Sequence, residues 1–170
     1  MLKNGILIFL VSLLSACGGS DSADSTDPAT PASNTAGQAT ELEGSWAYSC
    51  QFDPDLSVYS SNTVTFAGNT ISQSATDYLD PACTVVDDTA TSNGTFTIGN
   101  TLTPISGGSA RELNITISSI NGNTVTINFY DIYQISGNTL YTGVEDLVNN
   151  SLSPSTRPVT LDFGLAFIKQ

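Results

Sequence analysis

The chemistry open to this chain is limited by its side chains, because it contains no histidine and only four lysine or arginine residues. Without histidine, a Ser-His-Asp arrangement is excluded and a metal site would depend on oxygen ligands. The chain has no phosphate-binding P-loop, no dinucleotide-binding glycine pattern and no Asp-x-Asp-x-Asp-Gly calcium loop. Paired acids could form a glycosidase site, but a sequence does not reveal the separation of two carboxylates. We therefore expect no enzymatic activity, no cofactor and no metal.

The first cysteine of the chain follows a segment with the composition of an export signal. Lys3 precedes an almost wholly apolar run from Gly5 to Leu14. This run is too short to span a bilayer as a helix, which needs about 20 apolar residues. A charged start, a short apolar core and small residues before a cleavage point are typical of a secretory signal peptide. We expect this signal peptide to comprise residues 1–16.

The residues at the end of this segment, Leu14-Ser15-Ala16-Cys17, resemble the lipobox of bacterial lipoproteins. The resemblance implies that the mature chain begins at Cys17, whose sulfur carries diacylglycerol and whose amine carries a fatty acid such as palmitate. Each buried methylene contributes about 0.8 kcal/mol, so several acyl chains hold a protein firmly at a membrane. Gly18 follows the cysteine, which in this family implies sorting to the outer membrane. The alternatives are an ordinary signal peptide followed by an unrelated cysteine, or a buried helix.

Two further cysteines, Cys50 and Cys83, remain once Cys17 is lipidated. They lie in a compartment that oxidises thiols, so we predict that they form a disulfide. Closing this loop of about 34 residues stabilises a fold by roughly 3–4 kcal/mol in the chain-entropy model. A catalytic or metal-binding role is not expected, because the chain offers no histidine to activate a thiol or to share a metal.

The segment from Gly18 to Thr40 contains no leucine, isoleucine, valine or aromatic residue. Such a segment cannot bury enough apolar surface to offset the entropy lost on ordering. We expect residues 17–40 to form a lipidated, disordered linker with an average end-to-end distance of about 25–30 Å. This linker would hold a domain of residues 41–170 above the membrane.

Acidic residues number 16 and give the chain a formal net charge of −12. Such a surface repels nucleic acid and anionic lipid headgroups. Solubility and adaptation to saline media account for this composition. The alternative is weak binding of calcium or of a cationic partner, for which Asp53 with Asp55, or Asp87 with Asp88, are the candidate positions.

Apolar and polar residues alternate from Glu41 onward, as is typical of β-strands. Four Gly-Asn-Thr sequences, starting at Gly68, Gly99, Gly122 and Gly137, suit hairpin turns because glycine and asparagine tolerate positive φ. We predict an all-β domain, an antiparallel meander of about eight to ten strands closed into an up-and-down barrel, with a β-sandwich as the alternative. The expected strands are residues 44–52, 58–67, 70–78, 83–89, 93–98, 110–119, 123–135, 139–144 and 158–168.

The first expected strand opens with Gly44-Ser45-Trp46, which resembles the Gly-x-Trp motif of lipocalins. In that family the tryptophan packs across the closed end of the barrel, so the resemblance implies a lipocalin-like barrel that binds a small ligand. The chain departs from the family pattern in two ways. It lacks a long helix after the meander, and its last strand carries no arginine to cover the tryptophan, only Lys169 nearby.

One expected hairpin places three polar side chains on the core-facing side of the sheet. With a three-residue loop over residues 120–122, Arg111 falls opposite Asp131 and Tyr133 follows on the same face. These residues could hold the polar headgroup of a ligand at the barrel mouth. The alternatives are a structural ion pair near the barrel end, or a local bulge that turns Asp131 outward.

Two functions fit this sequence. In the first, a membrane-anchored barrel binds a small, partly apolar molecule in the bacterial envelope. In the second, a filled barrel is a structural or protein-interaction module that contacts another envelope protein. Small residues lining an interior cavity of some hundreds of Å³ favour the first function, whereas filling by Trp46, Phe129, Phe163 and Phe167 favours the second.

Overall fold

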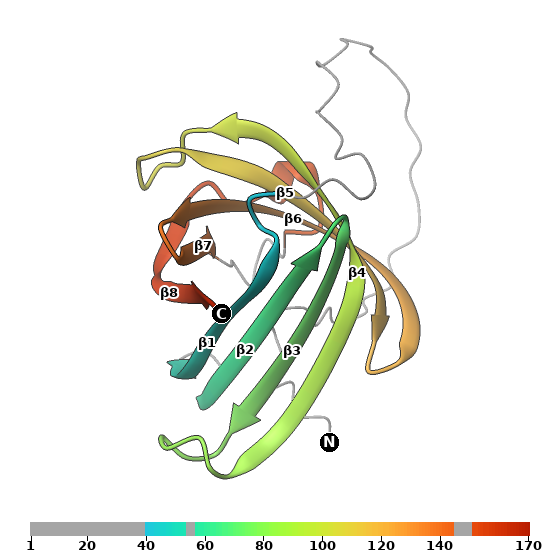
Figure 1. Ribbon diagram of the computed structural model, residues 1–170, viewed down its shortest axis with the longest axis vertical. Coiled ribbons are helices and arrows are strands. Elements are labelled where there is room, and N and C mark those ends of the chain that lie inside the picture. Colours follow the sequence, from blue (N-terminus) through green and yellow to red (C-terminus); the bar gives the residue numbers. More distant parts are fainter. Residues whose placement is uncertain (1–39, 54–56, 145–150) are drawn as a thin grey trace.

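A computed structural model describes residues 40–53, 57–144 and 151–170 of the chain. The expected signal peptide, Cys17 and all but the last residue of the linker lie outside the described residues. The described part is an all-β, closed antiparallel barrel in which strands pair in chain order (Figure 1). This confirms the predicted up-and-down barrel, consistent with a lipocalin-like fold, and not the sandwich. The strands are β1 (Gly44–Asp53), β2 (Val58–Ala67), β3 (Thr70–Tyr78), β4 (Val86–Leu102), β5 (Ala110–Ile120), β6 (Asn123–Ser136), β7 (Thr139–Gly143) and β8 (Leu161–Lys169).

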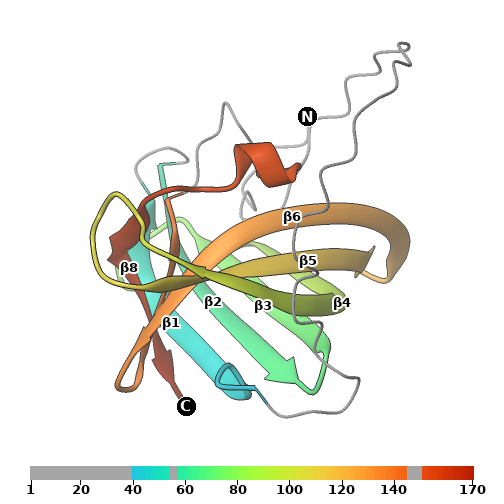
Figure 2. The same cartoon turned by 90° about the horizontal axis from the view of Figure 1, so that it is seen from above.

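The barrel walls differ in length. Strands β1 to β4 form one continuous wall, β5 and β6 cross over it, and β7 and β8 close the remaining side (Figures 1 and 2). The 17-residue strand β4 runs along the barrel and pairs with both β3 and β5. The seam between the first and last strands is short, with two paired positions, Trp46 with Lys169 and Ala47 with Ile168.

The main apolar core lies around Trp46, which is only 1% exposed. The indole Nε1 of Trp46 donates a hydrogen bond of 2.7 Å to the carbonyl oxygen of Leu42, so the segment before β1 folds against the barrel. The Nζ of Lys169 lies 5.0 Å from the centre of the tryptophan ring, a cation–π geometry. We call this part of the barrel the Trp46 end. Its buried side chains include Leu42, Trp46, Phe66, Ile71, Phe96, Ile98, Leu113, Ile115, Phe129, Tyr133, Leu140 and Phe167.

Three of the four Gly-Asn-Thr sequences form the predicted turns, with φ of 61° at Gly68, 77° at Gly122 and 61° at Gly137. The turn expected at Gly99 was wrong, and so was the separation of residues 83–89 from 93–98, because β4 is one strand. A Cβ at Gly99 would collide with the side chain of Glu112 on β5, and one at Gly94 with the backbone of β5. These two glycines therefore allow β5 to approach β4 closely and do not reverse the chain.

The hairpin of β5 and β6 has a different register from the predicted one. Its turn has two residues, Asn121 with φ of 49° and Gly122 with φ of 77°, the conformation that an Asn-Gly pair favours in a hairpin. A bulge between Ile117 and Ser119 then shifts the pairing, so that Ile117 faces Ile127. The three-residue loop expected at residues 120–122 was therefore wrong. The longer loop was expected because it places apolar residues opposite one another, and the bulge achieves the same pairing with a two-residue turn.

The last strand departs from regular alternation around Asp162. The carboxylate Oδ1 of Asp162 accepts hydrogen bonds from the backbone N–H groups of Gly164 at 2.7 Å and Leu165 at 3.3 Å. The pairing of β7 with β8 shifts here, and Phe163 is 52% exposed, with its ring against Tyr141 at 5.1 Å. Phe163 therefore does not fill the interior, whereas Trp46, Phe129 and Phe167 do.

A short 3-10 turn, η1 (Pro154–Thr156), precedes β8 and is held to β5 and β6 by Arg157. The Nη1 of Arg157 donates a hydrogen bond of 2.6 Å to the carbonyl oxygen of Asp131, and its Nη2 donates one of 2.7 Å to Oδ1 of Asn114. The guanidinium also lies 5.5 Å from the centre of the Tyr130 ring. In the part of the chain that the structure describes, no helix is long and apolar enough to cross a membrane.

Candidate ligand site inside the barrel

Among the residues that the structure describes, four polar side chains are buried inside the barrel, and they come from three adjacent strands. Cross-strand partners point to the same face of a sheet. Asn62 pairs with the buried residues Tyr48 and Ala75, so it faces the interior, and the other three share the same alternation. We call this set the polar wall. Its members are Asn62 of β2, Gln73 and Asp77 of β3, and Ser92 of β4.

The polar wall follows from the period of two in β3. Every second residue of this strand is buried, first Ile71 in the apolar core, then Gln73, Ala75 and finally Asp77. The same inward side therefore becomes more polar with distance from the Trp46 end. The sequence places a charged residue at the last inward position of β3, where a filled core would have an apolar one.

Asn62 is 1% exposed, and neither its Nδ2 nor its Oδ1 has a hydrogen-bond partner. An unpaired buried polar group costs about 1–3 kcal/mol, and native structures have few such groups. The neighbouring Gln73 accepts one long hydrogen bond, 3.4 Å, from Ser92. The wall therefore has spare capacity for hydrogen bonds to a group that does not belong to the described part of the chain.

Asp77 is 3% exposed, and its carboxylate Oδ2 also lacks a partner. Burial raises the pKa of Asp77, and the negative charges of Asp88, Asp53 and Asp87 act in the same direction, so that this pKa reaches about 6. At neutral pH the group is therefore mostly ionised, at a cost to the folded state. A positive charge or a hydrogen-bond donor beside Oδ2 would relieve this cost.

Small side chains occupy the inward positions between the polar ones. Ala75 stands between Gln73 and Asp77 on β3 and pairs with Ala90 on β4, and both alanines are buried. The Trp46 end has rings and branched chains at the corresponding positions of these strands, including Phe66 and Phe96, whose rings lie edge to face at 5.0 Å. The inward side chains near Asp77 are therefore smaller than those of the Trp46 end.

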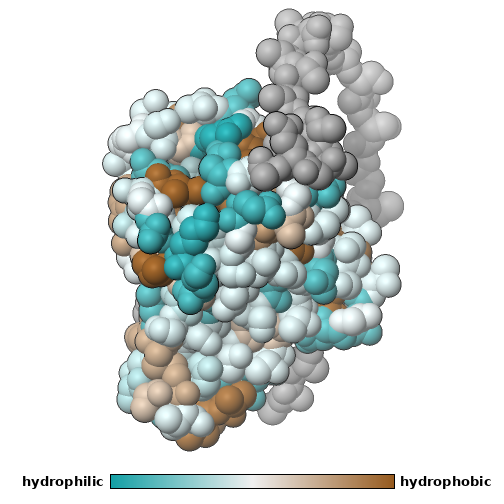
Figure 3. All heavy atoms as spheres, in the orientation of Figure 1, coloured by the Kyte–Doolittle hydropathy of each residue, from teal (hydrophilic) through white to brown (hydrophobic). Residues whose placement is uncertain are grey.

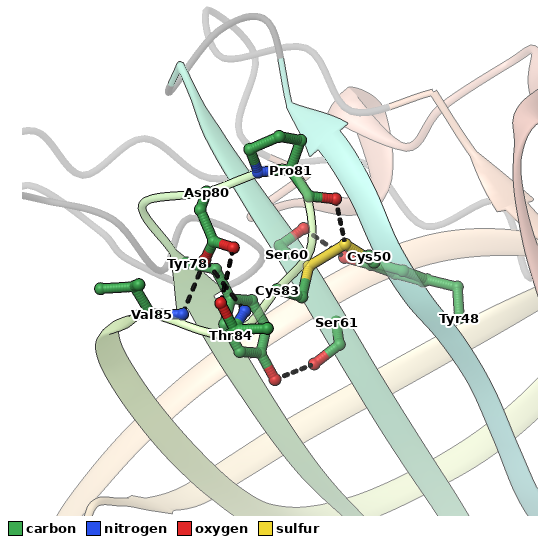
Figure 4. The surroundings of a disulfide bond; sticks show 10 residues. All are labelled: Tyr48, Cys50, Ser60, Ser61, Tyr78, Asp80, Pro81, Cys83, Thr84 and Val85. Carbon is green, nitrogen blue, oxygen red and sulfur yellow. Dashed lines mark hydrogen bonds between the residues drawn. A yellow bond between two sulfur atoms is a disulfide. The ribbon is translucent and has the colours of Figure 1, made fainter.

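The disulfide predicted between Cys50 and Cys83 is confirmed, with 5.7 Å between the two Cα atoms. It joins a bulge in β1 to the loop of residues 79–85 between β3 and β4, as Figure 4 shows. The loop is also fixed by Asp80, whose Oδ1 accepts hydrogen bonds from the N–H groups of Thr84 at 2.9 Å and Val85 at 2.6 Å. We call this part of the barrel the disulfide end, and Asp77 lies two positions before its loop.

Arg111 and Tyr133 were predicted to hold a ligand, but both contact Glu41 at the Trp46 end. They lie opposite each other on β5 and β6. Arg111 makes an ion pair of 2.6 Å with Oε1 of Glu41, and the hydroxyl of Tyr133 donates a hydrogen bond of 2.6 Å to the same oxygen. This Glu41 latch fastens the segment before β1 to the barrel. It matches the structural ion pair kept as the alternative, with a different acid as the partner.

The latch changes the titration of its members. Burial alone would raise the pKa of Glu41, but hydrogen bonds from Tyr133 and Arg111 outweigh it and lower the pKa. Burial and the bond to Glu41 raise the pKa of the Tyr133 hydroxyl, which therefore stays protonated. The glutamate is thus ionised and the tyrosine is a donor over the whole neutral range.

Asp131, the third predicted site residue, faces Leu113 rather than Arg111, so the expected pairing was wrong. The bulge that shifts the hairpin is the cause. Oδ1 of Asp131 accepts hydrogen bonds from the N–H groups of Ile132 at 2.7 Å and Gly143 at 3.0 Å. Burial raises its pKa to about 7, against the effect of these bonds and of Arg157. Ligand binding by Arg111, Asp131 and Tyr133 stays a prediction, but their contacts are structural.

Nothing in the sequence analysis singled out Asn62 or Asp77. The signal that the sequence offered was the alternation of residues along each strand. Asn62 lies on the same side of β2 as Phe66, and Asp77 lies on the same side of β3 as Ile71. A polar residue on the apolar side of a strand is the pattern that identifies such a site. Within the described ranges, no three histidine, cysteine, aspartate or glutamate side chains come together in a group that could hold a metal ion.

No protein-family model matches the chain, and no curated protein resembles its sequence at a significant level. The comparisons therefore assign no family.

Proposed function

We propose that the protein is a lipoprotein of the bacterial envelope, anchored in the outer membrane through Cys17, whose lipocalin-like barrel binds a small molecule at the polar wall. We propose a binding protein rather than an enzyme. The observation that carries this proposal is the buried amide of Asn62, both of whose polar atoms lack partners. A ligand with hydrogen-bonding groups would supply the missing partners and offset the cost of burying this amide.

The surroundings of Asn62 favour a ligand that is polar at one end and apolar at the other. Tyr48, its partner on β1, packs edge to face against Phe167 at 4.9 Å and belongs to the apolar core. Val64, the next inward residue of β2, also packs against that core. The polar group of a ligand would therefore meet Asn62 and Asp77, while its apolar part would lie toward Tyr48 and Val64.

The anchor is supported by the N-terminal sequence. A signal-like segment ends in Leu14-Ser15-Ala16-Cys17 and continues into a polar segment with few apolar side chains. The Cys50–Cys83 disulfide also supports export, because disulfides persist in oxidising compartments and are rare in the cytosol.

Two observations favour the second function, a protein-interaction module. The first is that Trp46, Phe129 and Phe167 pack into the interior of the barrel. The second is that the disulfide end exposes several large apolar side chains, and Figure 3 shows apolar surface gathered at the lower end of the molecule, where Figure 1 places the loop between β3 and β4. Exposed apolar patches mark interaction sites on soluble proteins. The exposed fractions are 54% for Phe52, 61% for Leu79, 50% for Val85 and 55% for Val86.

Native mass spectrometry tests the binding function. The full chain carrying Cys17→Ser, exported and purified without detergent, is expected to retain a small molecule from its host. Asn62→Leu is expected to lose that molecule. Asn93→Leu, the same substitution at an exposed position of β4, is the matched control and should keep it. A chain that carries no bound molecule and binds none when challenged with cell extract would favour the interaction module.

Metabolic labelling with a fatty acid tests the anchor separately. The wild-type chain is expected to become labelled and to fractionate with the outer membrane, whereas Cys17→Ser should be unlabelled and released. An unlabelled wild-type chain, or a Cys17→Ser chain that remains in the membrane fraction, would contradict lipidation while leaving the barrel and its site untouched.

A further inference from the structure

We propose that the ligand of the polar wall is a small organic cation, whose ammonium or guanidinium group pairs with Asp77 while a neighbouring group bonds to Asn62. This inference rests on the proposed binding function and specifies the chemical class of the ligand. It is carried by the position of unpartnered polar atoms on two buried side chains, the lack of a cation beside them among the described residues, and the charge around the disulfide end.

The first step is the geometry of Asn62 and Asp77. Asn62 pairs with Ala75, and Asp77 is the next inward residue of β3. Diagonal neighbours of this kind have Cα atoms about 7–8 Å apart, so one small molecule can contact both side chains. Each is at least nine-tenths buried and has polar atoms without partners. The two residues therefore offer an anionic acceptor and an amide on the same inward surface.

The second step is the absence of a protein cation for Asp77. The chain has four lysine or arginine residues and no histidine. Arg111 pairs with Glu41, Arg157 donates to Asn114 and to the backbone of β6, and Lys169 lies over Trp46. The fourth, Lys3, lies in the expected signal peptide. Buried carboxylates are normally paired or protonated, so the natural partner of Asp77 is a cation that does not belong to the described part of the chain.

The third step is the electrostatic field at the disulfide end. Asp88 pairs with Asp77 across the strands, and Asp53 and Asp87 are close enough to raise its pKa together with Asp88. The hydroxyl of Tyr48 lies 3.3 Å from Oγ of Ser60, the residue that pairs with Asp77 on β2. Such a field draws cations inward and repels anions.

The fourth step distinguishes an organic cation from a metal ion. A divalent ion needs about six or more oxygen ligands, whereas in the described residues no group of three acids or other metal-binding side chains is present. Asn62, Ala75 and Ala90 provide an amide and small apolar contacts instead. These surroundings fit the compact carbon skeleton of an amine better than a bare ion.

The test measures binding of three amines, ethylamine, butylamine and phenethylamine, and of the alcohols with the same skeletons. Calorimetry and saturation-transfer NMR are carried out on the full chain with Cys17→Ser at pH 7.5 and low salt. We expect at least one amine to bind about 10-fold or more tightly than its alcohol, and 3-phenylpropanoate not to bind. Asp77→Asn should abolish the preference for the amine. Because it removes an unpaired buried charge, this variant is not expected to unfold.

Asp88→Asn is the matched control, since it removes the same net charge from the exposed partner of Asp77. It should weaken amine binding by less than about 3-fold. No binding of any amine, or equal binding of amines and alcohols, overturns the cationic ligand. If alcohols or 3-phenylpropanoate bind and Asn62→Leu abolishes that binding, the proposed function stands without this inference. If no probe binds and native mass spectra show no retained molecule, both the cationic ligand and the proposed binding function are wrong.

Discussion

The Trp46 end and the disulfide end of the barrel differ in how far their buried polar side chains are paired, although Oγ1 of Thr40, next to Glu41 at the Trp46 end, also lacks a partner. At the Trp46 end, the indole of Trp46 donates to Leu42 and the hydroxyl of Tyr133 donates to Glu41. At the disulfide end, atoms of Asn62 and Asp77 have no such partners. The paired groups belong to β1, β6 and the segment before β1, whereas Asn62 and Asp77 belong to β2 and β3. The Trp46 end stabilises the fold, whereas the unpaired atoms at the disulfide end destabilise it at the positions where we propose that a ligand binds.

The largest effect is expected at the Trp46 end. Trp46→Ala removes the central ring of the core, which should lower the free energy of unfolding by about 3–5 kcal/mol. Chemical denaturation of the full chain at pH 7.5 measures this change. A loss below about 1 kcal/mol would mean that the apolar half does not carry the stability of the barrel.

Removal of the disulfide should have the next largest effect. The double variant Cys50→Ser, Cys83→Ser is expected to lose about 3–4 kcal/mol of stability. Hydrogen exchange should increase first in residues 79–85 and in the adjoining ends of β1 and β4, because the disulfide ties these segments together. Uniform loss of protection over the whole barrel would contradict the separation into two halves.

A smaller effect of opposite sign is expected for Asp77→Asn. The pKa of Asp77 in the folded barrel is about 6, above its ordinary value of 3.8, so the ionised group destabilises the fold. This penalty is fully present above about pH 6 and disappears as the pH falls below about 4. The variant should therefore gain about 1–3 kcal/mol at pH 7.5 and almost nothing at pH 3.5. A loss of stability at pH 7.5 would show that Asp77 has a favourable partner in the free protein.

The smallest effect is expected for Glu41→Gln in the latch. The ion pair with Arg111 is partly exposed, with side-chain exposures of 38% and 44%, so it should contribute about 0.5–1 kcal/mol. The pKa of Glu41 is lowered in the folded state. Its contribution is therefore present at neutral pH and is lost as the pH falls through that lowered pKa. Thermal unfolding at pH 7 and pH 3 measures it, and equal losses at both pH values would contradict an electrostatic latch.

Alternation of apolar and polar residues was sufficient to predict the barrel, because strands in a closed sheet have one buried and one exposed side. The turns at Gly68, Gly122 and Gly137 were predictable, because a tight hairpin turn requires residues with positive φ and this requirement depends only on the local sequence. Gly99 was misread because its role depends on Glu112 of the neighbouring strand. The disulfide followed from cysteine counting and the expected compartment, and required no knowledge of the fold.

The site was harder to predict than the fold. The predicted pairing of Arg111 with Asp131 depended on the register of the hairpin. A single bulge changes this register, so that Arg111 pairs with Tyr133 and Asp131 with Leu113. The prediction also missed Glu41, which comes from before the first strand and pairs with Arg111. The alternation along β2 and β3 indicates that Asn62 and Asp77 face inward. Whether a buried amide has a hydrogen-bond partner, however, depends on the side chains of all the strands around it. Sequence alone does not contain that information in readable form.

The short seam between β1 and β8 determines when the barrel can form. The first strand pairs with the last at Trp46 and Ala47, and the backbone N–H of Gln170 donates to the carbonyl oxygen of Ser45. The barrel closes only when β1 pairs with β8. Folding therefore depends on contacts between parts of the domain that are far apart in the sequence, and we expect it to be slow. Until β8 arrives, the edges of β1 and β7 are open to pairing with other chains. This closing step is compatible with the export proposed above, because folding cannot be completed before β8 has been synthesised.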